Sequence, residues 1–299
     1  MYRRLAVAVS AALIILVLQP AFGAKDNSRA KWVSTTPWQI SEQWFGGFSG
    51  LEVSDDGQSF VMISDRSQMV KGRFERESGK IVEVELLERT AMRGSDGGLF
   101  KNSDRDSEGL AQSKDGTLFV SFEGKDRVES FRKLSSLGLT LNGSPAFEGM
   151  KPNGAFEALA IDDAGFLVAL PENPLGRPDQ ALVFRFEGKR WTQPFPITRD
   201  PIFHPVGADF GPDGSFYLLE RAFNGLGFRS QVRRFDVTKT GFVNGVTLVR
   251  TFTGKHDNLE GLAVWKDDDG EIRLTMVSDS NFRFVQRTEI VEYVVPENT

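Results

Sequence analysis

Acidic residues recur at equivalent positions along this sequence, and they are the side chains best suited to chemistry. Five segments share one pattern: a short apolar run, a turn of the Asp-Gly type and a second apolar run. Acids stand where the first run begins or where the second run ends. The first position is acidic in three segments and the second in five: Glu108, Glu157 and Glu260, then Asp65, Glu123, Glu172, Glu220 and Asp279.

Such a group of carboxylates predicts a site for a hard cation. Two carboxylates at about 5 Å repel each other by roughly 3 kcal/mol at an effective dielectric constant near 20, so a cluster needs an offset. Metal ions, neighbouring cations or raised pKa values can supply it. The chain has no cysteine and only two histidines, so its oxygen ligands favour Ca²⁺ or Mg²⁺ over zinc. Asn281, close to Asp279, is a further candidate ligand.

Two arginines directly follow acidic positions and are the nearest cations by sequence. Arg66 comes after Asp65, and Arg221 comes after Glu220. Guanidinium groups suit phosphate oxygens because they offer paired N–H donors. We therefore expect Arg66 or Arg221 to hold an anionic group of a substrate. The predicted catalytic set is Glu108, Glu157, Glu260, Arg66 and Arg221.

A structural role is the alternative for the same acids. Acidic residues that recur in a repeat can accept hydrogen bonds from backbone N–H groups of the adjacent unit and do nothing else. The aspartates within the turns belong at the opposite end of each unit, and we expect them to form turns. They are Asp56, Asp115, Asp213 and Asp269.

The spacing of the repeat predicts the fold. A small residue follows each lead position, at 50, 109, 158, 207 and 261, so the period of 49 to 59 residues is typical of a propeller blade. Each copy forms a hairpin, and further apolar runs supply a third and a fourth strand. We predict an all-β propeller of about five four-stranded blades, with a sixth, degenerate blade as the alternative.

The two ends of the domain are expected to meet in one blade. The last copy provides only three strands and ends at 290–295, whereas a strand-like stretch at 32–40 precedes the first copy. An N-terminal strand that completes the last blade would close the ring and cover exposed strand edges. Circular symmetry then brings the acidic positions to one end of the central channel.

A series of short motifs runs along the chain in a fixed order. They are Ser49-Gly50-Leu51, Ser64-Asp65-Arg66, Asp106-Ser107-Glu108-Gly109-Leu110-Ala111, Glu157-Ala158-Leu159, Leu219-Glu220-Arg221, Asn258-Leu259-Glu260-Gly261-Leu262 and Ser278-Asp279-Ser280-Asn281-Phe282. This series, spread roughly from Phe45 to Val294, resembles the phytase-like domain family, also called esterase-like activity of phytase. The resemblance implies an exported bacterial propeller loosely similar to calcium-dependent β-propeller phytases, and hence Ca²⁺ and a phosphate ester. The basic residues that line the phosphate site of those phytases cannot be aligned onto this chain.

The first 23 residues have the layout of a secretory signal peptide. Two positive charges precede an apolar run from Leu5 to Leu18, and Ala21-Phe22-Gly23 offers small residues for cleavage. About 14 apolar residues are few for a helix that spans a bilayer, although an uncleaved anchor is the competing interpretation. We predict a signal peptide at 1–23, a single propeller domain at 24–299, and a periplasmic or secreted protein.

Composition and motifs exclude several classes of function. A net charge of −5 without a basic run argues against nucleic acid and against an anionic membrane surface. Without cysteine there is no disulfide and no thiol nucleophile. The segment Gly47-Phe48-Ser49-Gly50-Leu51 lacks the last glycine of a serine-hydrolase elbow, and no P-loop, Rossmann or zinc-protease signature occurs. The expected partner is a small molecule.

Three functions are compatible with these residues. The first is calcium-assisted hydrolysis of a phosphomonoester or phosphodiester by water. The second is a propeller that binds a metal or ligand without catalysis. The third is a lactonase-like propeller, suggested by Glu172-Asn173 and by Asp279 to Asn281. The sequence predicts neither the exact substrate nor the oligomeric state.

Overall fold

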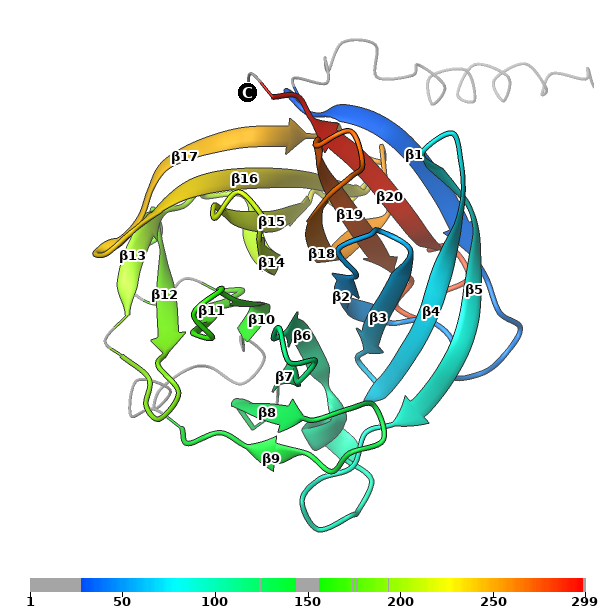
Figure 1. Ribbon diagram of the computed structural model, residues 1–299, viewed down its shortest axis with the longest axis vertical. Coiled ribbons are helices and arrows are strands. Elements are labelled where there is room, and N and C mark those ends of the chain that lie inside the picture. Colours follow the sequence, from blue (N-terminus) through cyan, green and yellow to red (C-terminus); the bar gives the residue numbers. More distant parts are fainter. Residues whose placement is uncertain are drawn as a thin grey trace, which may run out of the picture.

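Twenty strands form five four-stranded antiparallel sheets, which stand like blades around a central axis (Figure 1). They lie in the part of the chain that this computed structural model describes: residues 28–123, 125–143, 156–173, 175, 177–192 and 194–297. The only helix in these ranges is the short 3₁₀ helix Asn102–Arg105. The prediction of an all-β propeller is confirmed, with five blades rather than six.

The first four blades run outward from the channel in chain order. Blade 1 consists of β2 (Phe48–Val53), β3 (Ser59–Ser64), β4 (Gln68–Glu77) and β5 (Lys80–Ala91), and blade 2 of β6 (Ser107–Gln112), β7 (Leu118–Phe122), β8 (Arg127–Phe131) and β9 (Leu139–Thr140). Blade 3 consists of β10 (Phe156–Ile161), β11 (Leu167–Pro171), β12 (Gln180–Phe186) and β13 (Phe195–Thr198). Blade 4 consists of β14 (His204–Phe210), β15 (Phe216–Phe223), β16 (Phe228–Thr238) and β17 (Gly241–Arg250). Blade 5 consists of β18 (Asn258–Lys266), β19 (Ile272–Asp279), β20 (Thr288–Val295) and, outermost, β1 (Lys31–Trp38).

The N-terminal strand β1 closes the ring, as predicted. It pairs antiparallel with β20, and Figure 1 shows it at the outer edge of the last blade, beside β5 of the first. The Thr36 hydroxyl donates to the Ile81 carbonyl at 2.7 Å, which ties β1 to blade 1. An element from one end of the chain therefore completes the blade at the other end and covers its edge.

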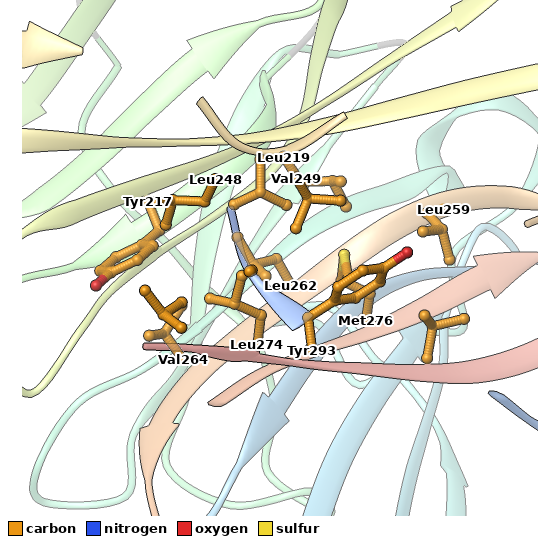
Figure 2. Packing of buried hydrophobic residues seen from close by; sticks show 14 of the residues in the cluster. Tyr217, Leu219, Leu248, Val249, Leu259, Leu262, Val264, Leu274, Met276 and Tyr293 are labelled. Atoms are coloured by element: carbon orange, nitrogen blue, oxygen red, sulfur yellow. The ribbon is translucent and has the colours of Figure 1, made fainter. Parts of the chain in front are cut away.

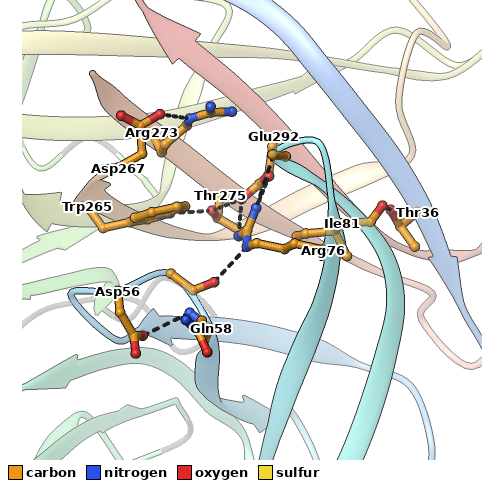
Figure 3. A network of polar contacts seen from close by, with 12 residues as sticks. Thr36, Asp56, Gln58, Arg76, Ile81, Trp265, Asp267, Arg273, Thr275 and Glu292 are labelled. Atoms are coloured by element: carbon orange, nitrogen blue, oxygen red, sulfur yellow. Dashed lines mark hydrogen bonds and ion pairs between the residues drawn. The ribbon is translucent and has the colours of Figure 1, made fainter. Parts of the chain in front are cut away.

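A buried ion pair also joins the first and last blades (Figure 3). Arg76 on β4 donates to both carboxylate oxygens of Glu292 on β20 at 2.8 Å, and the Glu292 side chain is fully buried. Thr275 donates to the same carboxylate, and the Arg76 guanidinium lies over the Trp265 ring. Removing one member of such a pair leaves an uncompensated charge, which typically costs about 3–5 kcal/mol.

The small residue of each repeat lies where neighbouring innermost strands come closest. A Cβ atom on Gly109 would lie 2.7 Å from Leu159 Cβ and 2.8 Å from the Glu157 carbonyl oxygen of the next blade. Gly261 stands in the same relation to Leu51 of blade 1, so the inner strands form a closed ring. A Cβ atom at these glycines would push the blades apart, which explains why four of the five positions are glycine and the fifth is alanine, the smallest residue with a side chain.

Apolar side chains fill the space between blades. Figure 2 shows one cluster, in which Tyr217 and Leu219 of blade 4 lie together with Leu262 and Met276 of blade 5. Further clusters join the other blades in the same manner. The many short apolar strands thus stabilise the ring through contacts between blades as well as within them.

The turns at the opposite end largely follow the prediction. Asp56, Asp115 and Asp213 each accept a hydrogen bond from the backbone N–H two residues later. In blade 5 Asp269 also lies in the turn, directly before Gly270 as predicted, but the carboxylate that accepts the backbone N–H groups there is that of Asp267. The Gly270 N–H donates to the Asp267 carbonyl, so this turn spans the same positions as the turns of the other blades.

The predicted signal peptide, residues 1–23, lies outside the described residues. Its cleavage, the domain boundary at residue 24 and export therefore stay predictions. Within the described ranges no helix has the length and apolar character that crossing a membrane would require.

Candidate functional site

Every innermost strand carries a bulge at the residue before its small residue. The register between the first two strands shifts at this point in all five blades. A bulge leaves its extra residue unpaired and re-aims that side chain. The bulged residues are Ser49, Glu108, Glu157, Val206 and Glu260. Three blades therefore present a glutamate at the same end of the channel, which we call the mouth.

The second strands bring another set of side chains to the mouth. In each blade the residue before the bulge pairs with a residue of the second strand. The residue that follows this partner in the chain reaches the mouth. These next residues are Asp65, Glu123, Glu172, Arg221 and Asp279. Four of them are the predicted acids, whereas blade 4 has an arginine at the equivalent position.

Glu220 does not belong to this set, which corrects its assignment to the acidic site. It lies one residue before the equivalent position, and successive side chains of a strand point to opposite faces. Its fully buried carboxylate accepts hydrogen bonds of 2.6 and 2.7 Å from Arg233 and of 2.8 Å from Gln231. Glu220 therefore forms an ion pair inside blade 4.

Arg221 offsets part of the carboxylate charge on one side of the mouth: burial raises the pKa values of Glu157 and Glu260, and the Arg221 charge lowers both. Its guanidinium forms an ion pair with Glu260 and lies 3.2 Å from Glu172 Oε1 and 3.8 Å from Glu157 Oε2. It also donates to Asn258 Oδ1 at 2.8 Å. Burial alone would lower the pKa of Arg221, but the three carboxylates outweigh burial and raise that pKa above its usual value. We call Arg221, Glu157, Glu172 and Glu260 the arginine half of the mouth.

The other side of the mouth gathers carboxylates around a space that suits one cation. One oxygen each of Asp106, Glu108 and Glu123 lie within 4.8 Å of one another. Burial raises the pKa of Glu108 well above its usual value, and the charges of Glu157, Glu260, Asp106 and Glu123 raise it further. We call Asp106, Glu108 and Glu123 the open half.

Asp106 was not among the predicted site residues because it lies outside the repeated positions. It precedes Glu108 by two residues, and its carbonyl oxygen accepts the Glu123 N–H at 2.8 Å. Residues two apart in an extended chain share one face. That spacing was the available signal for placing Asp106 beside Glu108.

Two further carboxyl groups, Asp65 beside Asp106 and Asp279 beside Glu260, have pKa values near neutral pH. Burial raises the pKa of Asp65 to about 7, and the charge of Asp106 adds to this. Burial raises the pKa of Asp279 to about 8, followed by the charge of Glu260. Asp65 Oδ1 is buried and has no hydrogen-bond partner among the described residues. A buried, unpartnered oxygen near the open half fits a site for a hard cation.

The loop after β19 is pinned at the rim of the mouth. Asn281 and Phe282 have φ angles of 47° and 50°, a conformation that is costly for residues with a side chain. The Asn281 N–H donates to Asp279 Oδ1 at 2.6 Å. The Arg66 guanidinium carbon lies 3.2 Å from the centre of the Phe282 ring. These contacts place the predicted residues Asn281 and Arg66 on the rim, next to the carboxylates rather than among them.

Two grooves flank this loop. One, of about 810 Å³, is lined by Arg221, Glu172 and Asn281 together with several apolar residues. The other, of about 830 Å³, is lined by Arg66 and by residues that follow β1. The mouth therefore has room for a molecule larger than a single phosphate ion.

Two more carboxylates, Glu52 and Asp209, lie further along the channel. Each stands three residues after a bulge, in the two blades whose bulged residue is not glutamate. They accept backbone hydrogen bonds from the neighbouring blade, from Gln112 at 2.9 Å and Val264 at 2.6 Å. Burial raises the pKa of Asp209 to about 7; burial, then the charge of Asp209, raise that of Glu52 well above its usual value. These acids fill the structural role that was the alternative for the acids of the mouth.

Comparison with known families bears on the whole domain. The model of the Phytase-like family, described as esterase-like activity of phytase, matches residues 43–282. This match confirms the resemblance found in the ordered motifs. No curated protein sequence matches the chain significantly.

Solved structures resemble the fold over most of the chain. The alpha-L-arabinofuranosidase from Podospora anserina, in complex with cellotriose, has a TM-score of 0.56 at 10% identity, over 88% of this chain and 96% of that chain. The PQQ-bound aldose sugar dehydrogenase from Streptomyces coelicolor has a TM-score of 0.45 at 13% identity, over 87% and 98%. A gluconolactonase from Xanthomonas campestris has a TM-score of 0.46 at 14% identity, over 82% and 72%. At these identities the likeness concerns the fold alone.

Proposed function

The chain belongs to the Phytase-like family, and on that premise we propose that it is an exported, calcium-assisted phosphoester hydrolase that works at the channel mouth. The observation that carries this proposal is the open half, where oxygens of Asp106, Glu108 and Glu123 lie within 4.8 Å of one another. Ca²⁺ is bound by several oxygen ligands of this kind. The unpartnered Oδ1 of Asp65 offers a further ligand atom for the cation close by.

The open half would bind the cation, and the arginine half would bind the phosphate. Asp106, Glu108 and Glu123 would hold the cation, which would polarise the phosphoryl group and lower the pKa of a water molecule. Arg221 holds a phosphate oxygen, and Arg66 on the rim is a second anchor. Because Glu260 and its neighbours already fix the guanidinium of Arg221, its N–H groups are oriented before the substrate arrives.

Proton transfer falls to carboxyl groups beside the phosphate. Glu157 belongs to the arginine half and also feels the charge of Glu123; burial raises its pKa well above the usual value, whereas the Arg221 charge lowers it. In its ionised form, which a cation in the open half would favour, it accepts a proton from the attacking water as the water oxygen bonds to phosphorus. Asp279, whose pKa is about 8, holds a proton at neutral pH and delivers it to the leaving oxygen as the ester P–O bond breaks. A monoester and water thus give an alcohol and inorganic phosphate.

Release of product from a panel of phosphomonoesters and phosphodiesters tests this function. We expect turnover in calcium, loss of turnover in chelator, and a fall of about 100-fold in Glu108→Gln because a cation ligand is removed. Asp163→Asn is the matched control, because Asp163 is an exposed carboxylate in the turn of blade 3. The proposal is wrong if neither calcium nor chelator gives turnover above that of Glu157→Gln.

A propeller that binds a cation without catalysis is the second candidate. Arg221 already contacts three carboxylates, which leaves fewer of its N–H groups for a phosphate. This candidate predicts that calcium raises the melting temperature while no phosphoester is hydrolysed. Gluconolactone belongs in the same panel, because turnover of the lactone alone would favour the lactonase-like function instead.

Export of the enzyme rests on the N-terminal sequence. We propose that residues 1–23 are removed and that the mature protein is periplasmic or secreted. N-terminal sequencing of protein from the periplasm or medium should begin at Ala24. Protein that starts at Met1 in the membrane fraction would show an uncleaved anchor instead.

A further inference from the structure

The hairpin of blade 4 extends beyond the mouth. In the other blades the second strand ends at, or one residue after, the position equivalent to Glu220. In blade 4, β15 continues to Phe223, which pairs with Phe228 of β16. The turn at 224–227 therefore lies past Arg221, the residue that reaches the mouth.

This hairpin presents apolar side chains to the groove of about 810 Å³. Phe223 is 63% and Leu226 is 92% exposed, and the rings of Phe223 and Phe228 lie 4.9 Å apart between centroids. All three line the groove, and Val285, 68% exposed, lines it from the loop after β19. Large apolar side chains that gather around one hollow, rather than scatter over the surface, indicate a site for an apolar group.

The charges of the same groove favour a single phosphate. Arg283 and Arg287 line it in addition to Arg221, but Arg287 already pairs with a glutamate at 3.0 Å. Glu172 and Asp257 also line the groove and would repel additional phosphate groups. A densely phosphorylated molecule does not match this balance of charge, whereas one phosphate on an apolar body does.

We propose that the groove binds the organic arm of a phosphate ester, and that this arm is an aryl ring or an alkyl chain. The inference rests on the proposed function and names its substrate class. Arg221 lines the groove and also belongs to the mouth, so a phosphate held there lies next to the carboxylates while the arm contacts Phe223, Leu226 and Phe228. Esters of polar alcohols lack those contacts and bind more weakly.

Paired substrates test the preference. Rates in calcium are measured for 1-naphthyl phosphate and glycerol 3-phosphate with the wild type, Leu226→Ser and Leu87→Ser. Leu87 is an exposed leucine of β5 that does not line the groove, so its variant is the matched control. In Leu226→Ser we expect KM to rise about tenfold for naphthyl phosphate alone, because an apolar contact is lost. Equal KM changes for both substrates, or none, would overturn the preference.

Binding without turnover separates this inference from the proposed function. The fluorescence of 1-naphthylmethylphosphonate, which is not hydrolysed, is titrated with the same three proteins. Binding about tenfold weaker in Leu226→Ser than in Leu87→Ser supports the groove even where no variant releases phosphate. No binding to the wild type, or equal binding by both variants, rejects the groove and leaves any observed phosphate release intact. Adsorption to lipid vesicles that only Leu226→Ser loses, with unchanged phosphonate binding, would make this face a membrane surface and also reject the proposal.

Discussion

The two halves of the channel mouth are built from the same repeat, but the repulsion between their carboxylates is offset in different ways. In the arginine half, Arg221 contacts Glu157, Glu172 and Glu260. In the open half the three carboxylate oxygens lie within 4.8 Å of one another, and burial raises the pKa of Glu108. The bulges that present the glutamates are the same in both halves. The difference comes from the one blade that places an arginine where the others place an acid.

Departures from symmetry therefore decide how the gathered charge is used. Blade 4 departs twice, with Val206 at the bulge and Arg221 at the end of the second strand. A cation that belongs to the chain is permanent and fixes the carboxylates around it. In the open half, burial raises the pKa of Asp106 although the Arg105 charge lowers it, and burial raises that of Glu108, so these carboxyl groups bind protons or an ion from solution. Within one fold, the first arrangement suits a rigid anchor and the second suits a binding site.

Removal of the arginine should produce the largest change in stability. In Arg221→Met the three glutamates lose their shared cation, and breaking a buried ion pair in this way typically costs about 3–5 kcal/mol. We expect the free energy of unfolding, measured by urea denaturation in chelator at pH 8, to fall by about 3 kcal/mol. Arg177→Met is the control, because Arg177 is 71% exposed and pairs with Asp179 on the surface. It should change stability by less than about 1 kcal/mol. Equal stability of the two variants would remove the distinction between the halves.

A matched pair of glutamates should respond to different degrees. At pH 8 in chelator, Glu108→Gln should be more stable than the wild type by roughly 1–2 kcal/mol, since burial raises the pKa of Glu108 and each unit by which a pKa is raised costs about 1.4 kcal/mol once the group ionises. Burial also raises the pKa of Glu157, but the Arg221 charge lowers it, so Glu157→Gln relieves less repulsion and removes a partner of Arg221. Glu157→Gln should therefore be less stable than Glu108→Gln.

Calcium should further distinguish Glu108→Gln from Glu157→Gln. Calcium should raise the melting temperature of the wild type and of Glu157→Gln, but not that of Glu108→Gln. Calorimetry with calcium and with chelator measures both effects. If the two variants shift together under both conditions, the mouth is one site rather than two halves.

The acids deeper in the channel provide a third case, without a nearby arginine or a proposed cation. A raised carboxyl pKa means that the folded state binds the proton more tightly than the unfolded chain, so stability is fully present at acid pH and declines as the pH rises through the folded pKa. With the pKa of Asp209 at about 7 and that of Glu52 also raised, the free energy of unfolding should fall between pH 5 and pH 8. Glu52→Gln keeps an acceptor for the Gln112 N–H and should flatten this fall by about 1 kcal/mol.

The matched control for Glu52→Gln is Glu83→Gln, which removes an exposed carboxylate of β5. Glu83→Gln should leave the fall of the free energy of unfolding with pH unchanged. The flattening in Glu52→Gln should be the same in calcium and in chelator, because these two acids bind backbone N–H groups. A slope change that appears only in chelator would connect Glu52 to the open half.

The fold was predictable because its main determinants repeat. The small residues at 50, 109, 158, 207 and 261 are required by the close approach of the inner strands, so packing itself imposes the period that the sequence displays. Closure by β1 followed from counting strands in the last copy. Packing requirements of this kind act on every blade and leave a regular trace.

The site was only partly predictable because its decisive features do not repeat. Leu219-Glu220-Arg221 offers two adjacent charged residues, and the choice between them depends on a one-residue register that the sequence does not mark. Glu52 and Asp209 were missed because the equivalent position in the other blades is alanine, at 111, 160 and 263. The repeat locates the mouth, whereas pairing in individual blades determines which side chains enter it.

Arg66 is the other arginine of the mouth, and its removal should produce the smallest change in stability. It is exposed, its guanidinium lies over Phe282, and among the influences on Asp65 it ranks below burial and the charge of Asp106. Arg66→Met should lower the free energy of unfolding by less than about 1 kcal/mol, the usual worth of an exposed cation–π contact. KM for a phosphoester should nevertheless rise about tenfold with kcat little changed, because paired N–H donors to the phosphate are lost. The KM of Arg66→Lys should lie between those of the wild type and of Arg66→Met, since lysine keeps the charge but not the paired donors. A loss of stability as large as that of Arg221→Met would mean that both arginines offset the carboxylate charge. The distinction between the arginine half and the open half would then not hold.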